Sequence, residues 1–437
     1  MFQSLSNSMK VPELRNRILF TLGMILVFRI GTHIPTPGIN GALLLSKLPD
    51  NSELLSLLNM FSGGALRRFS IFALGIAPYI NSSIIMQLLV YVIPYFEHLA
   101  KEEGEEGRKT INQYTRYGTV LIGALQALGI SFMLERMGVV LHEGFAFKCM
   151  AVITLTAGTA FIMWLGEQMT SRGIGNGISI LITAGILAGL PEAIVHQWAV
   201  FNGDAGDVIK TAFLLVFIVA TIMLIVYVQD GVRKIPVQYA KRVVGRRVYG
   251  GQNTYIPLRV NQAGVIPVIF ASSILMFPAM ICNWLQGLDC MQDYLSNGFV
   301  QFVLNMFNYN SVTYLIIYVA LIIFFTYFYT AITFNIQELA DNMKKYGGFI
   351  PGIRAGQKTV EFLEKTTSRV TLAGGIFLSI VSVIPNLLIK FMNVNFYFGG
   401  TALLIVVGVA MDTMRQLESH LVTRNYEGFM KKNKGLR

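Results

Sequence analysis

Long apolar segments alternate with shorter charged ones along the whole chain. A membrane-crossing helix needs about 20 apolar residues, and the length and spacing of these segments predict an all-α polytopic membrane protein. The ten helices that we expect cover residues 18–34, 78–93, 116–134, 148–165, 176–190, 208–228, 262–280, 312–334, 370–389 and 399–414. Two further segments, 229–261 and 335–369, are long and charged, and we expect them to be loops outside the membrane.

One apolar segment, Leu54–Phe61, is too short to cross a membrane. It is followed by Gly63 and Gly64, whose dihedral freedom allows the segment to change direction relative to the next helix. Non-helical backbone at membrane depth occurs only where protein buries it or a water-filled cavity receives it. The pattern therefore predicts a re-entrant segment, which is either a movable stopper in a pore or a loop that only packs against its neighbours.

Composition supports a membrane protein and offers no catalytic chemistry. Of the 437 residues, 54% are hydrophobic and only 14% are charged, whereas soluble proteins carry about 25% charged residues. The cysteines Cys149, Cys282 and Cys290 follow no disulfide or metal-site pattern. The glycine-rich run at 173–177 lacks the Lys-Ser/Thr ending of a phosphate loop. We therefore expect no enzyme activity, no metal and no cofactor, so that the energy for any transport has to come from a partner.

The distribution of basic residues orients the chain. Lys and Arg gather at both termini and after the second, sixth and eighth predicted helices, which places these parts in the cytoplasm. The connection Pro191–Asp207 divides the chain into halves 1–200 and 201–437 with five helices each. Because five is odd, the second half is inverted relative to the first, and inverted repeats place the functional site between the halves. Arg29 lies within the first helix and is therefore a candidate functional residue, but because it is near the end of the helix we favour the alternative that it snorkels to the interface.

A series of short runs, in order from end to end, resembles the SecY family of protein-translocation channels. The runs are FSGGAL at 61–66, IFALGIAPYI at 71–80, GEEGR at 104–108, WLGE at 164–167, RGIGNGIS at 172–179, YAKR at 239–242, GRRVY at 245–249, AGVIP at 263–267, FIPGIR at 349–354 and FGGT at 398–401. The resemblance implies a clamshell of two inverted five-helix halves with a re-entrant plug helix at about 54–66. The plug and hinge residues that it implies are Leu58, Phe61, Gly63, Gly64 and Arg67.

The resemblance also implies an apolar ring at the narrowest part of a pore. By position in the matching runs, the ring residues are Ile76, Ile80, Ile178, Ile182, Ile269 and Ile405. Isoleucines in membrane helices usually face lipid, and taken one at a time these residues fit that alternative. An apolar constriction nevertheless suits a protein channel, because it closes around any side chain and resists wetting when empty.

Two more sets of residues follow from the resemblance. The lateral gate, between the second and seventh helices, includes Asn81, Gln87, Asn261 and Pro267. The docking surface for a SecA motor or a ribosome includes Lys241, Arg246, Arg247 and Arg354. Basic residues on such a surface neutralise RNA phosphates in a salt-dependent way, although membrane anchoring alone also explains their sign.

The function that the resemblance implies is passage of unfolded preproteins across the bacterial cytoplasmic membrane and lateral release of transmembrane segments into lipid. The implied partners are SecE-like and SecG-like membrane subunits, SecA or ribosomes, signal peptides, preproteins and membrane lipids. The alternative is an ion-coupled secondary transporter. Such a carrier needs acids, amides or ion ligands near the midplane, where the predicted helices offer mainly isoleucine.

Overall fold

The computed structural model divides the chain into two compact units. The first contains Met1–Val200, Ser272–Tyr314 and Val409–Arg437, and the second contains Phe201–Ala271 and Leu315–Gly408. The structure describes residues 11–41, 43–44, 59, 62–192, 194–195, 205–239, 242–244, 247–249, 253–286, 306–307, 311–392 and 400–434.

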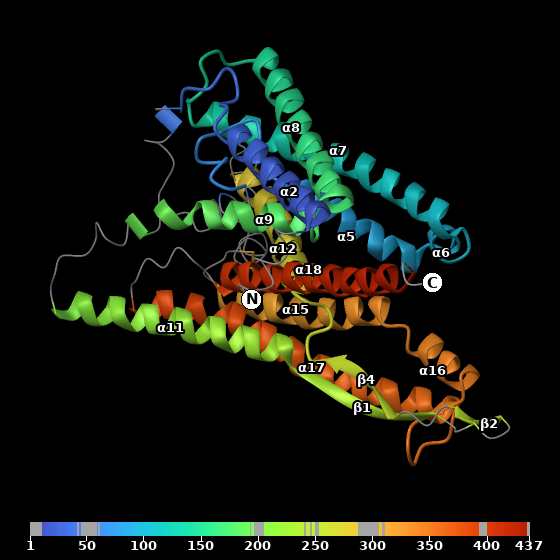
Figure 1. Cartoon of the computed structure of the whole chain (residues 1–437). Helices are drawn as coiled ribbons and strands as arrows, with labels where there is room; N and C mark the ends of the chain where they lie inside the picture. Colours follow the sequence, from blue (N-terminus) through green and yellow to red (C-terminus); the bar gives the residue numbers. More distant parts are fainter. Residues whose placement is uncertain are drawn as a thin grey trace. The chain divides into compact units, whose positions relative to one another are not determined.

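Helices make up the N-terminal part of the first unit (Figure 1). They are α2 (Pro12–Gly31), α5 (Ala77–Val92), α6 (Pro94–Lys101), α7 (Gly104–Arg136), α8 (Phe145–Arg172) and α9 (Gly177–Ala188). In this unit α7 packs against α5, α6 and α8, and α2 packs against α8 and α9. Small residues allow the close approach of these helices. A Cβ atom on Gly166 of α8 would lie only 3.1 Å from the Ile178 side chain on α9.

A sharp bend separates α5 from α6. The helix axis bends by 100° from α5 to α6. The residue between the two helices, Ile93, is extended, with a ψ of 117°. The cause is Pro94, because a proline disfavours the helical conformation in the residue before it. After α6, α7 begins at Gly104, well before the predicted start at 116, so the acidic and basic residues in between continue a membrane helix beyond its apolar part.

The second unit combines helices with a small sheet. Its elements, some of which extend into the first unit, are α11 (Ala205–Asp230), β1 (Val232–Tyr239), β2 (Arg242–Val244), β3 (Arg247–Tyr249), β4 (Asn253–Arg259), α12 (Ile266–Gln286), α15 (Val312–Thr333), α16 (Ile336–Lys345), β5 (Gly348–Phe349), α17 (Gln357–Met392) and α18 (Gly400–Lys434). The segments 229–261 and 335–369, expected to be loops, therefore contain strands and helices.

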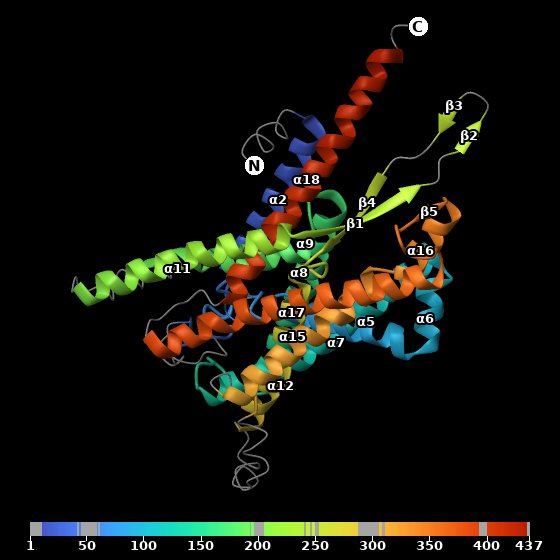
Figure 2. The same cartoon turned by 90° about the horizontal axis from the view of Figure 1, so that it is seen from below.

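The sheet is antiparallel in the order β4-β1-β5, with Ile235 of β1 opposite Ile256 of β4. Figure 2 shows the short pair β2–β3 at the far end of this hairpin. Ile235 and Val237 are buried on one face of β1 while their neighbours are exposed, as a strand with one packed face requires. They form a core with Leu258 of β4, Met343 of α16, Ile350 in the turn before α17, and Leu363 of α17.

Each of the ten predicted membrane segments contains a helix of the described chain, namely α2, α5, α7, α8, α9, α11, α12, α15, α17 and α18. Among the described residues, six helices are long and apolar enough to cross a membrane, or seven if the bent pair α5–α6 is one span. The described parts of α9 and α12 are apolar but shorter. The structure is thus that of a polytopic helical membrane protein.

Candidate functional site

The segment between Ser62 and α5 is an irregular stretch of turns that contains the predicted hinge. Gly63 and Gly64 both lie in the left-handed region, with φ of 68° and 85°, a conformation that glycine adopts at little cost. The amide of Gly64 donates a hydrogen bond to the carbonyl of Asn59 at 2.9 Å, which closes the turn. Leu58 and Phe61, predicted as plug residues, lie outside the described residues.

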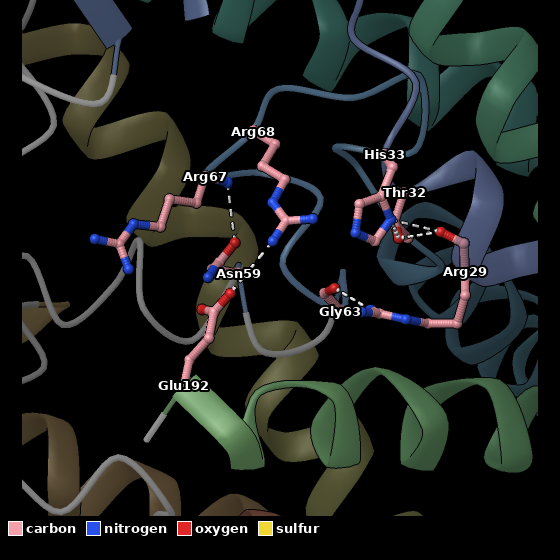
Figure 3. A network of polar contacts seen from close by, with 8 residues as sticks. All are labelled: Arg29, Thr32, His33, Asn59, Gly63, Arg67, Arg68 and Glu192. Carbon is pink, nitrogen blue, oxygen red and sulfur yellow. Dashed lines mark hydrogen bonds and ion pairs between the residues drawn. The ribbon is translucent and has the colours of Figure 1, made fainter. Parts of the chain in front are cut away.

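Gly63 is confined by two helices of the first unit. A Cβ atom at this position would lie 3.0 Å from Cα of Gly185 on α9 and 3.5 Å from the ring of Phe28 on α2. On α2, Nη1 of Arg29 donates a hydrogen bond to the Gly63 carbonyl at 2.8 Å (Figure 3). The turn therefore requires glycine for its conformation and for the space it occupies, and it is bonded directly to a charged side chain.

The residues after the glycines are fixed to the chain that follows α2. The amide of Thr36 donates to the Phe69 carbonyl at 2.9 Å, and the amide of Ile71 donates to the Ile34 carbonyl at 3.0 Å. Ser70 is completely buried. A change in direction of the segment that precedes the turn therefore has to occur ahead of Phe69, and Gly63 and Gly64 are the glycines in that stretch with left-handed backbone.

Polar contacts surround the exposed side of the turn (Figure 3). The amide of Arg67 donates to Oδ1 of Asn59 at 2.9 Å. The guanidinium of Arg68 lies 3.4 Å from the carboxylate of Glu192, and both side chains are about half exposed. Ion pairs exposed to this extent contribute little stability, so the contact between Arg29 and Gly63 is the stronger of the two charged contacts.

The predicted ring residues lie inside the protein. Five of them are between 0% and 4% exposed, namely Ile76, Ile80, Ile182, Ile269 and Ile405, and Ile178 is half-buried. The members from α9 and from the start of α5 belong to the first unit, and those from α12 and α18 belong to the second. This burial is the opposite of what lipid-facing isoleucines would show.

Two of the four predicted gate residues have buried polar atoms without a hydrogen-bond partner among the described residues. Asn81 on α5 is 6% exposed, and neither atom of its side-chain amide has a hydrogen-bond partner in the described part of the chain. Asn261 donates through Nδ2 to the Gly264 carbonyl at 2.9 Å, but its Oδ1 is buried without a partner there. Gln87 donates to Oγ of Ser83 at 3.2 Å. Pro267 is buried in the first turn of α12, where its missing amide hydrogen costs nothing.

Two of the predicted docking residues can be placed. Arg354 is exposed on the turn before α17, and its carbonyl accepts a hydrogen bond from the Thr359 hydroxyl at 2.9 Å. Arg247 begins β3, where its backbone pairs with Val244. Lys241 and Arg246 lie outside the described residues. Within the described chain, no group of three His, Cys, Asp or Glu residues is placed to hold a metal ion.

The contact of Arg29 with the glycine turn was not predicted from the sequence, although Arg29 itself was a candidate functional residue. Its half-buried side chain bonds to the backbone of the turn, and snorkelling to the interface stays a prediction. One available signal was the charge itself, since an ionisable residue in a membrane helix is by default a candidate for function. The roles of Gly185 and Glu192 had no such signal, because both depend on contacts distant in sequence.

Comparison with known proteins gives a consistent family. A family model described as SecY matches residues 70–414. Protein translocase subunit SecY of Escherichia coli (strain K12) is 48% identical over 433 residues, which cover 96% of this chain and 94% of that protein.

Solved structures show the same fold at lower sequence identity. One, described as the structure of a protein conducting channel, has a TM-score of 0.65 at 17% identity and covers 94% of this chain and 93% of its own. Another, Sec61 in the canine ribosome–channel complex from the endoplasmic reticulum, has a TM-score of 0.61 at 17% identity, with coverage of 94% and 93%.

Proposed function

The chain belongs to the SecY family, and we propose that it forms the protein-conducting channel of a Sec translocase. The observation that carries this function is 48% identity, over 96% of the chain, to a protein translocase subunit. Unfolded preproteins pass through the channel, and hydrophobic segments leave it sideways into the membrane. The comparisons give no support to the alternative of an ion-coupled secondary transporter.

The seal of the idle channel has two parts in this proposal. Ile76, Ile80, Ile178, Ile182, Ile269 and Ile405 form the apolar ring, and their burial supports this role. The segment of about 54–66 forms the plug, which changes direction at Gly63–Gly64. Support for the hinge comes from the left-handed conformation of both glycines and from the fixed residues that follow them.

The membrane topology in this proposal has ten crossings, with halves 1–200 and 201–437 inverted relative to each other and both termini in the cytoplasm. The membrane is the cytoplasmic membrane of a bacterium. Asn81, Gln87, Asn261 and Pro267 belong to the lateral gate. Within the described chain, the buried amide of Asn81 and the buried amide oxygen of Asn261 have no hydrogen-bond partner. This supports the placement, because a surface that opens can expose such groups to water or to a passing chain.

The partners in this proposal bind the membrane helices and the cytoplasmic surface. SecE-like and SecG-like subunits pack against the helices, and SecA or a ribosome binds the cytoplasmic surface through Lys241, Arg246, Arg247 and Arg354. The exposed Arg354 on the turn before α17 supports this role. A Sec61 channel of the same fold has been solved with a ribosome.

Reconstitution tests the proposed function. The purified channel, with its membrane subunits, is placed in lipid vesicles together with SecA, ATP and a radiolabelled preprotein. We expect preprotein to become protected from external protease only when SecA and ATP are both present. Saturable uptake of a small solute driven by an ion gradient, without preprotein protection, would instead support the transporter.

A further inference from the structure

Arg29 carries a charge within the apolar helix α2, where burial of a charged group is expensive unless it is paired. Its side chain is half-buried, and Nη1 lies 2.8 Å from the carbonyl oxygen of Gly63. A hydrogen bond from a charged donor is about twice as strong as one between neutral groups. The energy of this arrangement therefore depends on keeping Gly63 where it is.

The backbone from which this side chain extends is itself held in place. The carbonyl of Arg29 accepts a hydrogen bond from the Thr32 hydroxyl at 2.7 Å, and it lies 2.8 Å from Nδ1 of His33 (Figure 3). The preceding residue, Phe28, is 2% exposed and stacks on the ring of Phe72 with centroids 6.1 Å apart. Arg29 therefore reaches the glycine turn from a fixed point on α2.

On the side of the predicted plug, Asn59 accepts hydrogen bonds from the Gly64 amide at 2.9 Å and, through Oδ1, from the Arg67 amide at 2.9 Å. These bonds restrain the turn within its own segment, whereas the contacts with α2 and α9 come from outside it. Gly185 and Phe28 contact Gly63 by packing alone, and the ion pair between Arg68 and Glu192 is exposed. A rotation of the Gly63–Gly64 backbone moves the Gly63 carbonyl and breaks its bond to Arg29. The side chain of Arg29 is thus placed to resist this rotation.

We propose that Arg29 is a positioning residue that holds the Gly63–Gly64 turn, and thereby keeps the idle channel closed. This inference rests on the proposed function, because it requires that the segment before the turn seals a pore. It adds a residue on α2 to the closing machinery, acting on the backbone of the turn without being part of the plug or of the isoleucine ring.

The test is the ion conductance of idle channels in planar bilayers. Arg29→Met removes the donor and the charge but keeps a long unbranched side chain. We expect the ratio of open to closed channels to rise about 10-fold or more, because a hydrogen bond to a charged group is lost. Arg29→Lys keeps a charged donor and should restore most of the seal. If Arg29→Met fails to assemble, Arg29→Gln replaces it and should also leak.

Arg17→Met is the matched control. Arg17 is also on α2, and its Nη1 lies 3.5 Å from a different backbone carbonyl, that of Gly173. Idle conductance should stay at the parental level in this variant. A leak as large as that of Arg29→Met would show a general defect of α2 and would overturn the proposal.

Deletion of residues 54–66 separates this inference from the proposed function. The deletion should leak, and adding Arg29→Met to it should change nothing further, because the Gly63 partner is gone. If the deletion leaks while Arg29→Met and Arg29→Gln remain tight, Arg29 has no positioning role but the plug stands. Additional leak in the double variant also overturns the role of Arg29. A tight deletion variant overturns the plug and this inference together.

Discussion

The guanidinium of Arg116 and the carboxylate of Glu167 form a two-point ion pair between α7 and α8, with Nε 2.9 Å from Oε1 and Nη2 2.7 Å from Oε2. The paired geometry fixes both side chains, and the Glu167 side chain is only 25% exposed. Pairs of this kind are stronger than single exposed contacts. The pair therefore fixes the register of two helices that pack along much of their length.

Glu167→Gln should lower the stability of the purified channel and leave its conductance unchanged. We expect a loss of about 1 kcal/mol, because one charge-assisted contact is lost at a partly exposed site. The thermal midpoint in detergent should fall by about 1–3 °C. Glu361→Gln is the control, since its pair with Lys358 is mostly exposed and should contribute nothing measurable. Equal midpoints for the two variants would contradict the prediction.

The isoleucine ring predicts a progressive leak. Changing several of Ile76, Ile80, Ile178, Ile182, Ile269 and Ile405 to Ser removes apolar area worth about 25 cal/mol per Å² from the closed state. Each buried hydroxyl also costs about 1–3 kcal/mol unless it is hydrated. Both effects favour a wet constriction, so idle conductance in planar bilayers should rise with each added serine.

Exposed isoleucines provide the control for the ring. Ile153 on α8 is 69% exposed and Ile316 on α15 is 64% exposed, so changing both to Ser should leave the idle conductance at the parental level. An assembled multiple-Ser ring variant that is as tight as the parent would end the assignment of the ring.

The positions of the membrane helices could be predicted because apolar composition over about 20 residues is a local property. Their ends could not. α7 begins at Gly104, since a helix that leaves the membrane keeps its backbone hydrogen bonds while water solvates its charged side chains. The strand β1 did have a signal, the alternation that buries Ile235 and Val237, but its high charge favoured a loop.

The candidate site was only partly predictable. The glycines at 63 and 64 indicated an unusual backbone conformation, because few other residues adopt it. Their contacts with Arg29 and Gly185 could not be predicted from spacing, since they depend on how α2 and α9 pack around the turn. The ring isoleucines came from family resemblance, because one apolar residue among many has no local signal.

Arg354→Glu should impair transport more than folding. The residue is exposed on a turn and contributes little packing, while the charge reversal opposes binding of a SecA motor or of ribosomal RNA. We expect normal amounts of channel in the membrane and a large loss of SecA-driven preprotein translocation. Lys358→Glu reverses an exposed charge nearby and should have a smaller effect. Undiminished translocation by Arg354→Glu would remove the residue from the docking surface.

Asn81 and Ser82 are adjacent buried polar residues on α5 with opposite hydrogen-bonding states. The Ser82 hydroxyl donates to the Thr115 carbonyl at 2.7 Å, whereas the Asn81 amide has no partner in the described chain. A buried polar group without a partner costs about 1–3 kcal/mol, and a satisfied one contributes about 0.5–1.5 kcal/mol. Replacing these two residues should therefore change stability in opposite directions.

Asn81→Leu should raise the thermal midpoint of the channel, and Ser82→Ala should lower it. Because Asn81 belongs to the predicted gate and is next to Ile80 of the predicted ring, the more stable closed packing of Asn81→Leu should also make opening harder. Preproteins with weakened signal sequences should then be exported less, while those with strongly hydrophobic signals should be little affected, and Ser82→Ala should not show this selectivity. A lower midpoint for Asn81→Leu would mean that the amide is satisfied by water or by a partner subunit, and unchanged export of weak signals would place Asn81 outside the gate.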